Sequence, residues 1–115
     1  MFTNWSSASQ TGETTVRTGP RTSSSYRAAR AYQIILESTS QPNAGPRLHK
    51  HPYAETFIIR RGSATFTIGS SQVIGRAGQV LVAPAQTPHK FSTGPGGYEA
   101  VHIHASPRFV TDWLE

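Results

Sequence analysis

The sequence predicts an all-β protein, a small antiparallel β-barrel or sandwich, and three observations favour this class. A chain of 115 residues has the length of one domain with one core. Ten glycines and eight prolines suit a fold with many turns better than a helical bundle. From residue 31 onward, short β-type runs alternate with Gly, Pro and Ser at close, regular intervals. We therefore expect one barrel domain over residues 29–115.

A polar, basic arm, residues 1–28, precedes the predicted domain. The first thirty residues hold four arginines and one glutamate, which is +3 of the net charge of +5. These arginines lie among Ser and Thr, without the aromatic residues of a stacking platform or the helical pattern that enters a DNA groove. The charge therefore predicts a solvated arm and no nucleic-acid partner.

Several classes of protein are excluded or disfavoured by composition. The chain has no cysteine, which excludes disulfides, thiolate nucleophiles, Cys-type zinc clusters and iron–sulfur centres. No apolar run approaches the ~20 residues that a membrane helix needs, and the first ten residues lack the apolar core of a signal peptide. We expect a cytoplasmic protein that does not contact a membrane.

Seven or eight strands are expected where runs rich in β-branched and aromatic residues lie between turn residues. The triplet "GSS" at 69–71 fits a tight hairpin turn between two of these runs. We predict strands over residues 31–38, 47–51, 55–62, 64–69, 71–75, 79–83, 89–93 and 98–104.

One short helix is predicted at the C-terminus, in "SPRFVTDWLE". Ser106 can cap a helix and Pro107 suits its first position. The apolar residues that follow recur at helical spacing, so this helix would pack on the outside of the strands. They are Phe109, Val110, Trp113 and Leu114.

Two histidines in "HKHPYAE" raise the question of function. Period two along a strand points His49 and His51 to the same side, together with Arg47. A proline then favours a turn, so an antiparallel neighbour could bring the carboxylate of Glu55 opposite the pair. His89, at the start of a later strand, is the fourth candidate.

Three imidazoles and one carboxylate form a set of nitrogen and oxygen ligands. That set suits Fe(II), Mn(II), Ni(II), Co(II), Cu(II) or Zn(II) rather than the all-oxygen shell of Ca or Mg. The His-x-His pair alone favours structural or exposed histidines over metal ligands. The spacing of the glutamate, the glycines and the later histidine favours one divalent transition metal.

These motifs resemble the two signatures of the cupin superfamily. "HKHPYAETFIIRRG" is similar to the first and "GQVLVAPAQTPHKFST" to the second, and together with their link they cover residues 45–93. The matching positions are His49, His51, Glu55, Gly62, Gly78, Pro84 and His89. The chain departs from the family pattern at three turn or strand-end positions, Asn43, Gln86 and Thr93.

The resemblance implies a fold and a ligand set. The fold would be a small antiparallel β-barrel of the cupin type, a double-stranded β-helix similar to a jelly roll. His49, His51, Glu55 and His89 would hold one divalent metal inside it. Octahedral coordination would leave up to two positions for water, substrate or dioxygen, whereas a tetrahedral zinc with four protein ligands would leave little room for chemistry.

Apolar neighbours are expected to wall the site. Phe57 and Ile59 share the face of Glu55, and Phe91 shares the face of His89, so these side chains would lower the local dielectric around a metal. Their alternative role is that of ordinary core residues, because a barrel interior has to be filled.

Arg47 is expected either in the substrate pocket or on the surface. On the face of the two histidines, its guanidinium could receive a carboxylate or enolate oxygen of a substrate. The alternative is a surface residue at a fraying strand start.

His102 and His104 form a second His-x-His pair. Their neighbours Val101 and Ile103 are apolar and are expected to face the core, which would direct the two histidines outward or into an interface. With the opposite register, His102 could be a general base near the metal.

The favoured function is that of an enzyme. A metal could take an enol, a hydroxy-ketone or a carboxylate through oxygen and act as Lewis acid, or run dioxygenase-type chemistry with O2, with Glu55 as proton acceptor. The resemblance to cupins also implies isomerase, lyase or cyclase reactions. The alternative is a non-catalytic, metal-stapled module that binds a small molecule. Because barrels of this type commonly pair through an edge strand, we also expect a homodimer.

Overall fold

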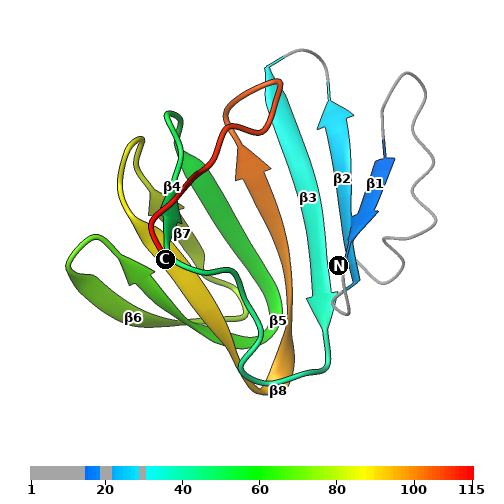
Figure 1. Cartoon of the computed structure of the whole chain (residues 1–115). Helices are drawn as coiled ribbons and strands as arrows, with labels where there is room; N and C mark the ends of the chain where they lie inside the picture. The colour runs from blue at the N-terminus through cyan, green and yellow to red at the C-terminus, as the bar shows by residue number, and fades with distance from the viewer. Residues whose placement is uncertain (1–14, 19–21, 29–30) are drawn as a thin grey trace.

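A computed structural model describes residues 15–18, 22–28 and 31–115. In these ranges the chain forms nine strands and no helix, so none of the described elements is a helix that could cross a membrane (Figure 1). The predicted all-β class is confirmed. The strands are β1 (Thr15–Thr18), β2 (Thr22–Ala28), β3 (Tyr32–Thr39), β4 (His49–Lys50), β5 (Glu55–Ile68), β6 (Ser71–Arg76), β7 (Val80–Ala83), β8 (His89–His104) and β9 (Asp112–Trp113).

The two longest strands, β5 and β8, form the centre of the sheet. They pair antiparallel from Glu55↔His104 to Ile68↔His89, with β3 on the other side of β8 and with β6 and β7 on β5 (Figure 1). Each long strand joins two runs that the sequence predicted as separate. Register shifts lie on both sides of Arg61 and Gly62. Gly62 has φ 71°, and a side chain there would collide with the backbone of residue 97, so this bulge requires glycine.

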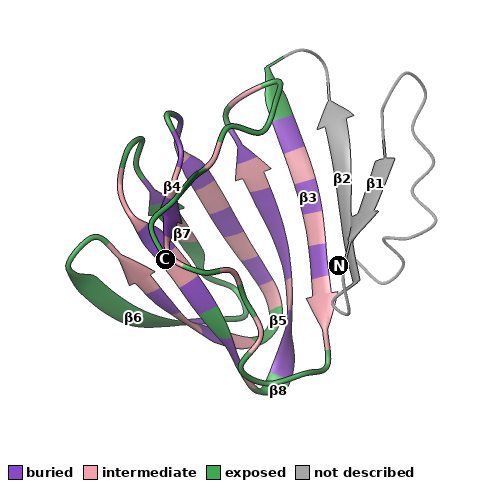
Figure 2. Cartoon of the chain, viewed as in Figure 1, coloured by how far each residue is buried: buried purple, intermediate pink, exposed green. Residues whose placement is uncertain are grey.

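The core follows the period-two pattern of these strands (Figure 2). Phe57 and Ile59 of β5 point inward and are each 1% exposed. They belong to one buried cluster with Phe66, Phe91 and several small residues, which allow neighbouring strands to lie close together. The ring centroids of Phe57 and Phe66 lie 4.9 Å apart, which is aromatic contact distance. This apolar cluster fills the barrel on one side of the histidines.

The predicted arm lies partly outside the described residues. Its described part, β1 and β2, forms an antiparallel hairpin, and β2 pairs with β3 along seven residues from Thr22↔Ser38 to Ala28↔Tyr32. This segment therefore extends the sheet at the β3 edge.

The predicted C-terminal helix is wrong. Residues 105–115, here called the C-terminal strap, contain bends and the short strand β9, which pairs with β4. The Leu114 N–H donates to the Leu48 carbonyl at 2.9 Å, and the Leu48 N–H donates to Glu115 Oε1 at 2.9 Å. Pairing with β4 thus overrides the helical spacing of the apolar residues. Figure 1 shows the strap running beside β4 to the C-terminus.

The loops keep the expected geometry at the three positions where the sequence departs from the family motif, Asn43, Gln86 and Thr93. Asn43 has φ 57° and Gln86 has φ 62°, so both adopt the left-handed backbone that glycine favours. Thr93 is buried, and its hydroxyl donates to the Gln41 carbonyl at 2.6 Å and accepts from the Ala44 N–H at 2.9 Å. One threonine side chain therefore ties the loop before β4 to β8.

Replacing Thr93 with valine should destabilise the protein by about 1–3 kcal/mol, because an isosteric methyl leaves the Gln41 carbonyl and the Ala44 N–H without their side-chain partner. Chemical denaturation measures the change in unfolding free energy. Thr67→Val, at a half-buried position of β5, serves as the matched control, and equal stabilities of the two variants would contradict the role assigned to Thr93.

Candidate metal centre

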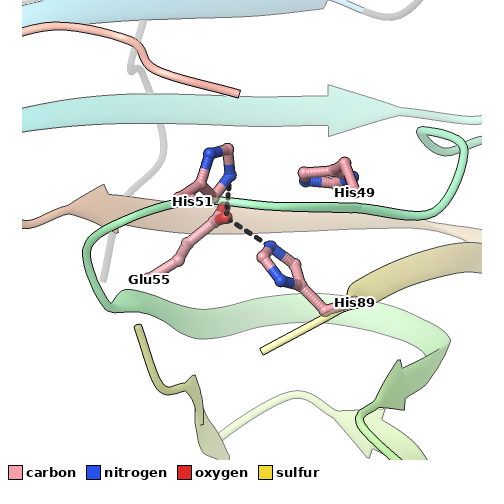
Figure 3. Close-up of side chains that lie close together, drawn as sticks. All are labelled: His49, His51, Glu55 and His89. Atoms are coloured by element: carbon pink, nitrogen blue, oxygen red, sulfur yellow. Dashed lines mark hydrogen bonds and ion pairs between the residues drawn. The ribbon is translucent and has the colours of Figure 1, made fainter. Parts of the chain in front are cut away.

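Four side chains from three strand ends meet inside the barrel (Figure 3). His49 lies in β4 and His51 just after it, while Glu55 and His89 are the first residues of β5 and β8. Pairing of His49 with His89 brings β4 and β8 together at this point. The four are buried, at 6%, 3%, 4% and 2% exposure, and one ligand atom from each lies within 4.8 Å of all the others. These are the four residues that the sequence predicts as metal ligands.

The backbone fixes the orientation of the three imidazoles. His49 Nδ1 lies 2.7 Å from the Arg47 carbonyl, His51 Nδ1 lies 2.9 Å from the Val110 carbonyl, and His89 Nδ1 lies 2.8 Å from the Thr87 carbonyl. A carbonyl only accepts, so each Nδ1 must carry the proton and donate it. In the neutral rings, every Nε2 then presents a lone pair.

The carboxylate of Glu55 meets these lone pairs. Its Oε1 lies 3.0 Å from His89 Nε2 and 3.2 Å from His51 Nε2 (Figure 3). The second contact lacks hydrogen-bond geometry, and His51 Nε2 has no hydrogen-bond partner among the described residues. Lone pairs facing each other in a buried site repel unless a proton or a cation lies between them. The residues therefore fit a divalent cation with three nitrogen ligands and one oxygen ligand.

The charges in the cluster support this arrangement. Burial alone would raise the pKa of Glu55, but the rings of His104, His51 and His89 hold it well below 4.5. Burial also opposes a charge on His89, yet the Glu55 carboxylate and the Thr87 carbonyl raise its pKa above 6.5. Burial is the main reason that the pKa of His49 is lowered. An ionised carboxylate thus faces basic imidazole nitrogens.

His102 and His104 lie inside the barrel, so their predicted outward orientation is wrong. They are 3% and 4% exposed. Opposite residues of paired strands share a face, and β8 places His104 opposite Glu55 and His102 opposite Phe57. His104 Nε2 lies 3.1 Å from Glu55 Oε2, and His102 Nδ1 lies 3.6 Å from the same oxygen. The pairing of β8 with β5 is the signal that locates them, and the sequence alone does not give that register.

The guanidinium of Arg47 does not join the cluster. Arg47 precedes the first residue of β4, so the strand parity that aligns His49 with His51 does not extend to it. It is exposed, with Cζ 5.0 Å from the centroid of the Trp113 ring, which in turn lies 5.2 Å from the His49 ring. With Lys90 it lines an outer groove of about 310 Å³. The contribution of Arg47 to the centre is its backbone carbonyl, which accepts a hydrogen bond from His49 Nδ1.

Two of the residues expected to wall the site pack against the ring of His102. Phe57 lies 4.8 Å from the His102 ring, and Phe91 lies 5.3 Å from the same ring. Ile59 belongs to the same apolar core. All three side chains belong to the apolar core, and their role in a substrate pocket stays a prediction.

Comparison with protein families gives one match. The family described as "Cupin domain" matches residues 36–104, which is more than half of the chain and includes all four residues of the cluster. No curated protein matches the chain.

Solved structures with similar folds agree with this match. A protein with a double-stranded β-helix domain from Klebsiella pneumoniae has a TM-score of 0.72 at 19% identity, over 87% of this chain and 90% of that one. A cupin superfamily protein from Desulfitobacterium hafniense has 0.68 at 20%, over 79% and 82%. Oxalate decarboxylase from Bacillus subtilis, in a study of its Mn(II) centres, has 0.73 at 20%, over 90% of this chain and 30% of that one. At these identities the likeness shows the fold alone.

Proposed function

This chain belongs to the cupin family, and from that premise we propose that it holds one divalent transition metal and acts as an enzyme on a small organic molecule. The ligands would be His49, His51, Glu55 and His89. The substrate would be an enol, a hydroxy-ketone or a carboxylate, because these molecules offer oxygen atoms to a metal.

One observation carries the proposal. All three histidines commit their Nδ1–H groups to backbone carbonyls, so three Nε2 lone pairs and the Glu55 carboxylate face one another in a buried space. Such convergence is costly unless a cation is bound. Mn(II) is the first ion to test, because oxalate decarboxylase of the same fold has Mn(II) centres; Fe, Ni, Co, Cu and Zn suit the same ligands.

The groups around the metal centre have different roles in the proposed reaction. A bound divalent metal supplies Lewis-acid chemistry and, if redox-active, chemistry with O2. The backbone carbonyls hold the imidazoles in the ligating tautomer. Phe57 and Phe91 exclude water from the inner side of the site, which strengthens electrostatic interactions there. Glu55 is the carboxylate of the cluster, and we assign to it the proton of a bound substrate, which it would accept on Oε1 when that oxygen loosens from the metal.

A second candidate function is a non-catalytic module in which the metal staples the barrel. The low exposure of all four ligands favours it, because a saturated, closed site has structural value without catalysis. The strap also lies against the centre, with Trp113 on the His49 ring.

Reconstitution separates the two functions. The metal-free protein is loaded with Mn(II), Fe(II), Co(II), Ni(II), Cu(II) or Zn(II), with and without air, and screened with enols, hydroxy-ketones and dicarboxylates for oxygen uptake and for turnover without oxygen. Turnover with at least one metal is expected. Metal binding without turnover, with a small molecule still bound, would favour the module, and failure to bind any of these metals would contradict both functions.

Metal affinity should decrease as the pH falls. The pKa of His89 is raised above 6.5, so a proton occupies this ring over a wider pH range and the metal must displace it. We expect constant affinity well above that pKa and a loss of about tenfold per pH unit below it, for one displaced proton. Calorimetry in buffers of different ionisation enthalpy measures the proton release; pH-independent affinity between pH 5 and 8 would contradict the expectation.

The homodimer and the cytoplasmic location stay predictions. An apolar outer face on the sheet supports the first of them. Ile34 pairs with Ile103, and Leu36 lies two residues further along β3; these three half-buried residues point away from the barrel interior because their neighbours point into it. On β7, Val80 and Val82 are 58% and 50% exposed, so they add further apolar surface.

A further inference from the structure

We propose that Tyr53 and His104 form a hydrogen-bond relay that makes Glu55 a one-oxygen ligand. The relay would direct Oε1 to the metal and keep Oε2 out of the coordination shell. This inference rests on the proposed function, because it assigns positioning residues to the same metal centre. Neither residue belongs to the ligand set: Tyr53 is not one of the matching positions of the first motif, and His104 lies beyond both motifs.

The direction of the relay is fixed at its inner end. Glu55 Oε2 lies 3.1 Å from His104 Nε2, and both groups are buried. A carboxylate only accepts hydrogen bonds, so His104 must carry a proton on Nε2 and donate it. The opposite tautomer would place a lone pair against the carboxylate. His104 is therefore a donor to Glu55 through Nε2, the nitrogen that faces the proposed metal position in the three ligand histidines.

The outer end agrees with this direction. The Val110 N–H donates to the Tyr53 oxygen at 3.3 Å, and the Tyr53 hydroxyl lies 2.9 Å from His104 Nδ1. In the neutral tautomer with Nε2 protonated, His104 Nδ1 is an acceptor, and the tyrosine hydroxyl supplies the proton. The chain of donors thus runs from Val110 through Tyr53 and His104 to Glu55.

The relay distinguishes the two oxygens of Glu55. Oε1 faces His51 and His89, whose Nε2 atoms carry lone pairs in the neutral rings, while Oε2 faces a donor. A carboxylate oxygen engaged by an N–H group is a poorer metal ligand, so coordination through Oε1 alone is favoured. His51 and His89 carry their proton on Nδ1, whereas His104 carries it on Nε2. This difference suits a metal on the Oε1 side of the carboxylate only.

Packing holds the relay in place. The Tyr53 ring stacks on His51 at 4.8 Å with an angle of 9° between the planes. Phe109 of the strap lies edge-on to His104 at 5.1 Å. Val110 contributes both of its backbone groups, because its carbonyl accepts from His51 and its N–H donates to Tyr53. One residue of the strap thereby supports a ligand and the relay together.

Three variants test the relay in the full-length, metal-loaded protein. Tyr53→Phe removes the donor to His104, His104→Leu removes the donor to Glu55, and His104→Gln restores a donor with its side-chain amide. Tyr98→Phe is the matched control, because it removes a hydroxyl that bonds to His102 at 2.8 Å in the same interior. The readouts are the Mn(II) dissociation constant and the infrared difference spectrum between loaded and metal-free protein, in which the carboxylate stretches distinguish one-oxygen from two-oxygen coordination.

We expect Tyr53→Phe and His104→Leu to weaken Mn(II) binding by about 10- to 100-fold. His104→Leu should also shift the carboxylate stretches towards two-oxygen coordination, whereas His104→Gln and Tyr98→Phe should stay within about threefold of wild type in affinity, as expected where the donor to Glu55 is kept. Wild-type affinity and spectra in both Tyr53→Phe and His104→Leu would overturn the relay, as would an equal loss in Tyr98→Phe. A wild-type protein that binds no metal would instead overturn the proposed function itself. Thermal unfolding of each metal-free variant shows that the fold is intact.

Discussion

Replacing Glu55 with glutamine is expected to weaken binding of Mn(II) or Zn(II) by at least about 100-fold, which corresponds to ~2.7 kcal/mol. The substitution keeps the size of the side chain and removes the negative charge of the four-residue cluster. In a buried site, that charge offsets much of the cost of bringing a divalent ion out of water. The amide also places an N–H₂ group where an oxygen meets His51 or His104. Competition with a chromophoric chelator measures the affinity.

Glu37→Gln provides the control for this substitution. Glu37 is also buried, at 4% exposure, but it lies in β3 outside the cluster. We expect its metal affinity to stay close to that of wild type. If Glu55→Gln binds metal as tightly as Glu37→Gln, the carboxylate is not a ligand and the centre described above is incorrect.

Ending the chain after Ser106 is expected to reduce metal affinity by about 10- to 100-fold without removing any ligand. The truncation deletes the Val110 carbonyl that accepts from His51, the Thr111 hydroxyl 3.3 Å from the same nitrogen, and the Trp113 ring on His49. His51 then loses the acceptor that holds its tautomer, and water reaches the centre. Because strap and metal would stabilise each other, metal should in turn protect the strap from proteolysis in the full-length protein.

A chain that ends after Leu114 is the matched control for the truncation. It loses only Glu115, whose side chain accepts from the Leu48 N–H and pairs with Lys90 at 2.9 Å on the surface. Exposed pairs of this kind contribute little, so we expect nearly unchanged metal binding. Equal affinities in the wild type and in the chain that ends after Ser106 would show that the strap does not support the centre.

The four cluster residues could be predicted because their positions depend on local spacing. His49 and His51 share a side by strand parity. Glu55 and His89 are each the first residue of a strand, and turn residues precede both strands in the sequence. Parity within one strand and the start of the next strand are short-range properties. The spacing of glycine and proline in the two motifs then indicated the family, which the family comparison supports.

The side of β8 that faces the interior could not be predicted in the same way. Strand β8 alternates His102 and His104 with Val101 and Ile103, and both sets are largely covered. Apolar residues usually face a core, but here they face the outer side of the sheet while the histidines surround Glu55. Only the long-range pairing of His104 with Glu55 decides between the two orientations.

The strap shows a second limit of sequence patterns. Phe109, Val110, Trp113 and Leu114 have helical spacing, yet local propensity is weak and tertiary pairing overrides it. The backbone of Leu48 and Leu114 pairs instead, and this places Trp113 opposite His49. The local sequence does not indicate that β4 has an open edge, or that the C-terminal residues pair with that edge.

The most direct measurement of the central claim is a crystal structure of the metal-loaded protein with diffraction recorded on both sides of the absorption edge of the metal. We expect a single anomalous peak in the barrel, bound by Nε2 of His49, His51 and His89 and by Oε1 of Glu55, with Oε2 still hydrogen-bonded to His104. A peak on other residues, or no peak in protein saturated with metal, would contradict this expectation.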